Sequence, residues 1–254
     1  RLGLGRYLIR NGYEKRSDIM LKHLDRVMEI CRANGFSPMI WSDMFFRMQF
    51  NGGYYVSEGE ISPDVMEKVP EGLTLIYWDY YNKSEKLLNH MVHCHKQFDR
   101  PVVFAGGAWK WSGFAPHNAK SLSVSEAQIK ACLSGGINDM IVTGWGDDGA
   151  EASQFSVLPT MLYWAESGYG NEDGLAERSL ECFDLAYDDL LKFDLPDVLP
   201  GIDPELKVCS PGKYLLYNDP IEGFMDAHVD AATASEAYRR NAEILLAKAN
   251  EKNF

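Results

Sequence analysis

Aromatic and acidic residues stand together at four points where an apolar, strand-like run of the sequence ends. These candidate binding residues are Trp41 and Asp43, Trp78 with Tyr80 and Tyr81, Trp109 and Trp111, and Trp145 with Asp147. The apolar face of a pyranose ring packs on an indole, and its hydroxyl groups donate hydrogen bonds to carboxylates. Ligands of parallel β/α folds bind at the carboxyl ends of the strands, so these residues predict a pocket for a terminal sugar.

The same residues also have a purely structural interpretation. A single tryptophan is often largely buried and belongs to a core as readily as to a binding site. Asp43 and Asp79 could each accept hydrogen bonds from loop amides. Five of the six tryptophans nevertheless fall at one end of the expected sheet. The acids beside them would be costly to bury without partners, so the set as a whole favours a binding site.

Side-chain alternation along a strand says which of these residues share a face. It places Trp41 with Asp43, and Trp78 with Tyr80, if the strand conformation continues to those residues. Tyr80 is therefore favoured over Tyr81 as the phenol that points into the pocket.

The elements that must position these residues follow one repeating pattern. Four apolar runs are expected to be strands: Pro38–Met44, Leu73–Tyr80, Pro101–Ala105 and Asp139–Trp145. Segments with helical periodicity are Lys15–Asn34, Ser62–Lys68, Ser84–Phe98, Ser123–Ser134 and Gln154–Ser167. Ser84 and Ser123 are typical N-cap residues. Apolar strands alternating with helices indicate an α/β fold with parallel strands, either a barrel or a doubly wound sheet.

The pattern changes after Asn171. An amphipathic helix is expected at Leu175–Phe193, followed by a connector rich in Pro and Gly and a last helix from about Phe224 to Lys252. No strand pattern occurs there. The sequence therefore predicts a partial barrel domain at residues 1–170 and a C-terminal helical domain at residues 171–254.

Composition excludes several classes of partner. The net charge is −12, which argues against nucleic acid and anionic membrane surfaces as partners. No apolar run is long enough to span a bilayer. The odd number of scattered cysteines favours free thiols and a cytoplasmic location: Cys31, Cys94, Cys132, Cys182 and Cys209.

Neither a cofactor nor a metal site is expected. No phosphate-binding glycine motif follows a strand, and the acids of the GWGDDG stretch would repel a nucleotide. His90, His93 and His95, together with Cys94, could suggest a metal. Their position on a helix between strands makes surface or packing histidines the better interpretation.

Five stretches resemble family 20 glycoside hydrolases, the β-N-acetylhexosaminidases, in their bacterial exo-acting branch. They are LGLGRYL, PMIWSDMFFR, IYWDYY, FAGGAWKWSGF and GWGDDGAEASQFSVLP. The resemblance covers about residues 1–169 strongly and the tail more weakly. It implies strands five to eight of a (β/α)8 barrel and a substrate with a terminal β-linked N-acetylhexosamine.

The resemblance also implies roles for individual residues. Trp41, Trp78 and Trp145 would enclose the sugar and its acetamide, and Asp147 would bind outer hydroxyls. Tyr80 or Tyr81 would donate a hydrogen bond to the acetamide. Either Trp109 or Trp111 would complete the pocket.

In this family the substrate's own acetamide attacks the anomeric carbon, while an adjacent Asp-Glu pair orients it and supplies the general acid. That pair is absent from this sequence. It is expected just upstream of Arg1, which makes the chain a fragment. Such a piece alone should be inactive, and its open strand edges should make it unstable or prone to associate, for instance as a homodimer.

Two further classes of function remain open from the sequence alone. A non-catalytic carbohydrate-binding protein could use the same tryptophans. A metal-dependent barrel hydrolase is disfavoured, because inward-facing histidines at the strand ends are missing.

Overall fold

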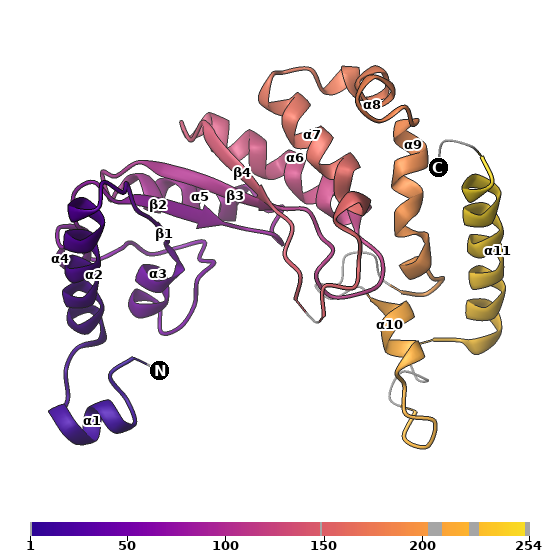
Figure 1. The fold of residues 1–254 in the computed structure, drawn as a ribbon. Helices are drawn as coiled ribbons and strands as arrows, with labels where there is room; N and C mark the ends of the chain where they lie inside the picture. The colour runs from indigo at the N-terminus through magenta and orange to yellow at the C-terminus, as the bar shows by residue number, and fades with distance from the viewer. Residues whose placement is uncertain (1, 148, 203–209, 224–228, 252–254) are drawn as a thin grey trace. The chain divides into compact units, whose positions relative to one another are not determined.

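The computed structural model describes residues 2–147, 149–202, 210–223 and 229–251 (Figure 1). The chain is an α/β protein whose four strands form one parallel sheet in the order β1-β2-β3-β4. The strands are β1 (Met39–Trp41), β2 (Thr74–Trp78), β3 (Val102–Gly107) and β4 (Asp139–Thr143). The sequence therefore predicted the fold class correctly, whereas membership of a barrel remains a prediction.

Helices separate the strands as their periodicity indicated. The helices up to β4 are α1 (Arg6–Asn11), α2 (Arg16–Ala33), α3 (Asp43–Gln49), α4 (Pro63–Met66), α5 (Glu85–Lys96) and α6 (Asn118–Ser134). Ser84 does cap α5, because its hydroxyl accepts from the amide of Leu87 at 3.5 Å. Ser123 is not an N-cap, since α6 begins at Asn118.

The rest of the described chain is helical. It contains η1 (Gln154–Val157), α7 (Leu158–Gly168), η2 (Glu172–Gly174), α8 (Leu175–Phe183), α9 (Tyr187–Leu190), η3 (Leu191–Asp197), α10 (Pro211–Leu216) and α11 (Ala231–Ala249). The single helix expected at Leu175–Phe193 is broken, because Asp184 adopts a left-handed conformation with φ 56° and ends α8. Part of the last expected helix, at 224–228 and 252, lies outside the described residues.

The chain divides into two compact units. The first contains Arg1–Gly106 and Ala127–Ile141, and the second contains Gly107–Glu126 and Val142–Phe254. These units differ from the segments 1–170 and 171–254, and that domain division stays a prediction. No described helix is long and apolar enough to cross a membrane.

The core of the first unit is built on the middle of the sheet. Leu75 and Tyr77 of β2 are fully enclosed, and α3 adds the buried rings of Phe45 and Phe46. Leu75 pairs with Val102 of β3, and Trp41 of β1 pairs with Ile76. This register fixes where the strand ends, and hence the candidate site residues, fall.

Candidate functional site

Trp41 and Trp78 close two neighbouring parallel strands of the first unit. The Cα of Trp41 pairs with that of Ile76, which lies two residues before Trp78 on β2. Paired residues of adjacent strands, and residues two apart on one strand, project from the same face of a sheet. Both indoles therefore leave the sheet from one face at its carboxyl end.

Three tyrosine rings contact the Trp78 indole, and a fourth extends the cluster. The centroid of the indole lies 4.9 Å from the ring of Tyr54, 5.6 Å from that of Tyr55 and 5.2 Å from that of Tyr80. The ring of Tyr81 lies 6.2 Å from that of Tyr55 and 6.0 Å from that of Tyr80. The rings of Trp78 and Tyr80 thus lie side by side, although β2 ends at Trp78, and Tyr80 is buried while Tyr81 is half-buried.

Tyr54 and Tyr55 come from the loop after α3, and sequence reasoning missed them. The amide of Trp78 donates to the Tyr54 hydroxyl at 3.1 Å, so this loop is bonded to the strand end. The Tyr55 hydroxyl is buried and has no hydrogen-bond partner among the described residues. Burial raises the pKa of this phenol, which therefore remains a neutral donor. The only signal in the sequence was the Tyr-Tyr pair after two glycines.

The opposite face of β2 turns toward α5. The ring of Tyr77 stacks on that of His95 with 4.5 Å between centroids. Asp79 follows on the same side and accepts from the Tyr77 hydroxyl at 3.3 Å.

Asp79 serves the turn that carries the two tyrosines. Its carboxylate accepts from the amides of Tyr81 and Asn82 at 2.9 and 3.0 Å, and from the Asn82 side chain at 2.8 Å. Burial raises the pKa of this carboxyl group, and the hydrogen bonds act in the opposite direction by lowering it. Of the two interpretations left open for Asp79, the structural one matches these contacts, because the carboxylate holds the backbone amides of Tyr81 and Asn82.

Asp43 does not share a strand face with Trp41. The expected strand Pro38–Met44 ends at Trp41, and Asp43 is the first residue of α3. A carboxylate is favourable in the first turn of a helix, and this one pairs with Arg47 at 2.9 Å. The alternation argument for Asp43 was therefore wrong, although its predicted contact with a substrate is untested.

Trp109 and Trp111 form a stacked pair in the second unit. Their ring centroids are 4.3 Å apart with 29° between the planes, and both residues are buried. The Lys120 ammonium lies 4.7 Å from the Trp109 ring centroid, a cation–π contact. The Trp109 amide donates to the Ser121 hydroxyl at 2.9 Å, which holds the segment on α6.

Trp145 and Asp147 follow β4 in the second unit. The strand ends at Thr143, two residues before the expected end, so alternation does not determine where these side chains point. The buried Lys110 donates from its ammonium to the Trp145 carbonyl at 3.4 Å. Trp145 is 40% exposed and Asp147 is exposed, so both are accessible in this unit.

A buried acid secures the start of α6. The Asp194 carboxylate accepts from the Asn118 amide at 2.9 Å, from the Asn118 side chain at 2.9 Å and from the Ala119 amide at 2.8 Å. Burial raises the pKa of Asp194 to about 6, against the effect of these bonds. Asp197, also buried, accepts from the Gly212 amide at 2.7 Å.

The structure therefore brings together Trp41, Trp78, Tyr80 and Tyr81 at one strand end, and separately Trp109 with Trp111. Trp41 and Trp78 belong to the first unit and Trp145 to the second, so their convergence on one hollow stays a prediction. Within the part of the chain that the structure describes, no three metal-binding side chains are grouped.

Comparison with known proteins adds no assignment. No protein-family model matches the chain, and a search of curated proteins finds no match either.

Proposed function

We propose that this chain forms the sugar-binding part of an exo-acting β-N-acetylhexosaminidase. The observation that carries the proposal is the aromatic cluster at the end of β2, where Trp78 packs against Tyr54, Tyr55 and Tyr80. Indole and phenol rings offer an apolar face for a pyranose and, at their edges, hydroxyl donors for its substituents. The family resemblance of the five sequence stretches supports the same substrate class.

In this proposal the four strands are half of a (β/α)8 barrel, and the helices after residue 170 form an accessory domain. The barrel interior would be the sheet face from which Trp41 and Trp78 project, because α5 covers the Tyr77 face. Parallel strands with helices on one side are what a barrel wall requires.

The phenols would act on the acetamide of the substrate. The hydroxyl of Tyr80, or the buried and neutral hydroxyl of Tyr55, would donate to the acetamide and hold its oxygen near the anomeric carbon. Neighbouring indoles would exclude water and favour a cyclic oxazolinium intermediate over direct hydrolysis. The sequence contains no Asp-Glu pair, so the proton transfers of the reaction are not assigned to residues of this chain.

That same absence favours a second candidate, a non-catalytic carbohydrate-binding protein. The two candidates differ in which ligand they bind best. A substrate-assisted enzyme is complementary to the cyclised acetamide, whereas a binding protein is complementary to the sugar itself.

Calorimetric titration tests both candidates directly. The chain is titrated with N-acetylglucosamine, with its thiazoline analogue and with glucose. Thiazoline binding at least about a hundredfold tighter than binding of the free sugar supports the hexosaminidase. Equal affinity for thiazoline and N-acetylglucosamine supports the binding protein, and no binding of any of the three contradicts both.

A further inference from the structure

Tyr54 takes the place at which a further β1 residue would pair with the end of β2. β1 ends at Trp41, which pairs with Ile76, and the chain then turns into α3. The Trp78 amide therefore has no partner in β1 and donates instead to the Tyr54 hydroxyl at 3.1 Å. A side chain from the loop after α3 thus continues the hydrogen bonding of the sheet at its carboxyl end.

The Tyr54 hydroxyl is itself tied to a buried group of hydrogen bonds. It lies 3.4 Å from the Ser42 hydroxyl, which lies 2.8 Å from the Ile76 carbonyl and 2.7 Å from Nε2 of His95. Because the Trp78 amide uses the phenol oxygen as an acceptor, the phenol proton remains for Ser42. Burial raises the pKa of Tyr54, so the phenol keeps this proton. These bonds join the Tyr54 loop to β2, α5 and the start of α3.

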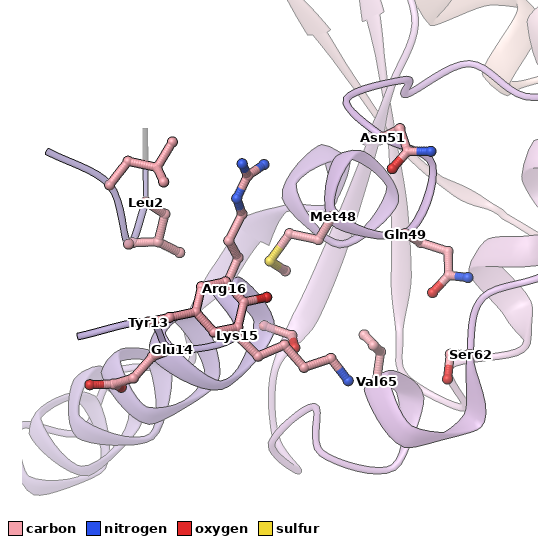
Figure 2. A pocket seen from close by; sticks show the side chains of 13 residues that line it. Leu2, Tyr13, Glu14, Lys15, Arg16, Met48, Gln49, Asn51, Ser62 and Val65 are labelled. Atoms are coloured by element: carbon pink, nitrogen blue, oxygen red, sulfur yellow. The ribbon is translucent and has the colours of Figure 1, made fainter. Parts of the chain in front are cut away.

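The segment that leads from α3 to Tyr54 has open space on one side. A cavity of about 510 Å³ in the first unit borders this segment, and Met48, Gln49 and Asn51 line it (Figure 2). On the inner side, Tyr54 is only 3% exposed, and its ring packs edge-on against that of Phe46 at 5.5 Å. The inward contacts of Tyr54 therefore anchor this loop to the sheet.

Two groups of the proposed sugar site adjoin Tyr54. The Trp78 indole packs on the Tyr54 ring with 4.9 Å between centroids, and it is half-buried, so part of it is accessible. Tyr55 follows directly in the chain, with its ring centroid 4.7 Å from that of Tyr54. The Tyr55 hydroxyl is buried and has no hydrogen-bond partner in the described part of the chain. One residue thus adjoins both an apolar surface and an unused donor.

We propose that Tyr54 is a positioning residue of the candidate sugar site. Its hydroxyl, held by Ser42 and bonded to the Trp78 amide, sets the Trp78 indole and the Tyr55 hydroxyl at the spacing that a sugar ring and its substituent require. The buried Tyr54 ring acts through these two neighbours and does not touch the sugar. The inference rests on the proposed sugar-binding function and adds to it a residue outside the contact surface.

Tyr54→Phe tests the inference, because it removes the hydroxyl and keeps the ring. Calorimetric titration of the folded variant with N-acetylglucosamine should show binding weakened about tenfold, the effect of one lost hydrogen bond. Tyr77→Phe is the matched control, since it removes another buried hydroxyl from the end of β2, on the face turned toward α5. Both variants should lose stability, but Tyr77→Phe should bind the sugar as the parent protein does.

Amide hydrogen exchange provides a second readout that needs no sugar. In Tyr54→Phe the Trp78 amide loses its acceptor and should exchange at least about tenfold faster. The amides of Leu75 and Asp79 donate to backbone carbonyls on the β3 side and keep these acceptors. Their exchange should therefore accelerate by a smaller factor than that of Trp78, whereas a general loss of stability would affect all three alike.

Ser42→Ala is a second variant, which keeps the Tyr54 hydroxyl and removes the group that holds it. It should weaken sugar binding several-fold, and it carries the test if Tyr54→Phe does not fold. Unchanged affinity in either folded variant, or equal losses in Tyr54→Phe and Tyr77→Phe, would overturn the inference while leaving the sugar site in place. No sugar binding by the parent protein would instead contradict the proposed function, and the inference would fall with it.

Discussion

The Ser42 hydroxyl lies 2.7 Å from Nε2 of His95, and both residues are completely buried. Nδ1 of His95 lies 2.6 Å from the Met91 carbonyl, which can only accept, so Nδ1 carries the proton. Nε2 of the neutral ring is then an acceptor, and it shares the single Ser42 proton with the Ile76 carbonyl, which lies 2.8 Å from the hydroxyl oxygen. The ring also stacks between Phe46 and Tyr77, with 4.5 Å to each centroid. His95 therefore joins β1, β2, α3 and α5 as a neutral group.

This arrangement makes the stability of the first unit sensitive to acid. Burial lowers the pKa of His95 from 6.5 to about 4. Between these values the unfolded state binds a proton that the folded state excludes. The free energy of unfolding should thus fall by about 1.4 kcal/mol per pH unit from pH 6.5 to 4 and level off below. Hydrogen exchange of β2 and α5 amides measures this free energy of unfolding at each pH. The slope of the free energy of unfolding against pH should shrink in His95→Gln. It should persist in His23→Gln, which changes an exposed histidine of α2. Equal slopes in the parent protein and both variants would refute the assignment to His95.

Asp194 should give the stability of the second unit the opposite dependence on pH. Its pKa is raised from 3.8 to about 6, so the folded state holds a proton that the unfolded state has released. The stabilisation is complete below pH 3.8 and is lost as the pH rises through 6. Hydrogen exchange of α7 amides should show stability decreasing over this range. Asp194→Asn should reduce the decrease, to which Asp197 also contributes because burial raises its pKa, whereas Asp188→Asn, at an exposed position, should leave it intact.

Ser42→Ala should destabilise the first unit by about 1–3 kcal/mol. The substitution removes the hydroxyl that lies between His95 Nε2 and the Ile76 carbonyl, and it leaves buried acceptors without this partner. Chemical denaturation, read out by the exchange of unit 1 amides, gives the value. Ser57→Ala changes an exposed serine of the same unit and should stay within about 0.5 kcal/mol of the parent. Comparable losses in the two variants would show that the pair contributes nothing specific.

Gly113 and Gly168 should respond to alanine with opposite signs. A Cβ on Gly113 would lie 2.8 Å from the Ser210 hydroxyl oxygen and 2.9 Å from an Asp197 carboxylate oxygen, both buried. Overpacking of this kind costs about 1–3 kcal/mol. A Cβ on Gly168, at the end of α7 in the same unit, meets no atom within 4 Å, so Gly168→Ala should be neutral or stabilise by up to about 1 kcal/mol. Thermal unfolding of the two variants measures both effects.

Tyr80→Phe should weaken binding of N-acetylglucosamine if the phenol holds the acetamide. Loss of one hydrogen bond in an enclosed site corresponds to a factor of about ten in the dissociation constant. Glucose, which has no acetamide, should bind equally to both proteins. Tyr169→Phe, at a position 90% exposed, is the control. A uniform loss for both sugars would assign Tyr80 to packing around Trp78.

The strands and their parallel order were predictable because each is a short apolar run between helical segments. The end of β1 was not predictable, since apolar residues continue after Ser42 and Asp43, and yet the chain enters α3 at Asp43. The face assigned to Asp43 was wrong for that reason. The rings of Trp78 and Tyr80 do lie side by side, 5.2 Å apart, although β2 ends at Trp78.

Long-range contacts explain the other differences. The start of α6 is set by Asp194, which is 76 residues away, so Ser123 was mistaken for the cap on local grounds. Tyr54 and Tyr55 reach Trp78 from a loop whose sequence has no strand or helix period. Neither partnership leaves a local pattern, and only the folded chain reveals them.

The carboxylate of Asp194 also limits where this protein can be shortened. Any chain that stops before η3 would leave the leading amides of α6 and the Asn118 side chain without their acceptor. A piece that ends at residue 170 would therefore lack these hydrogen bonds. The helices after residue 170 supply part of the hydrogen bonding of the β/α region. Removing them would leave the start of α6 without the carboxylate that accepts its hydrogen bonds.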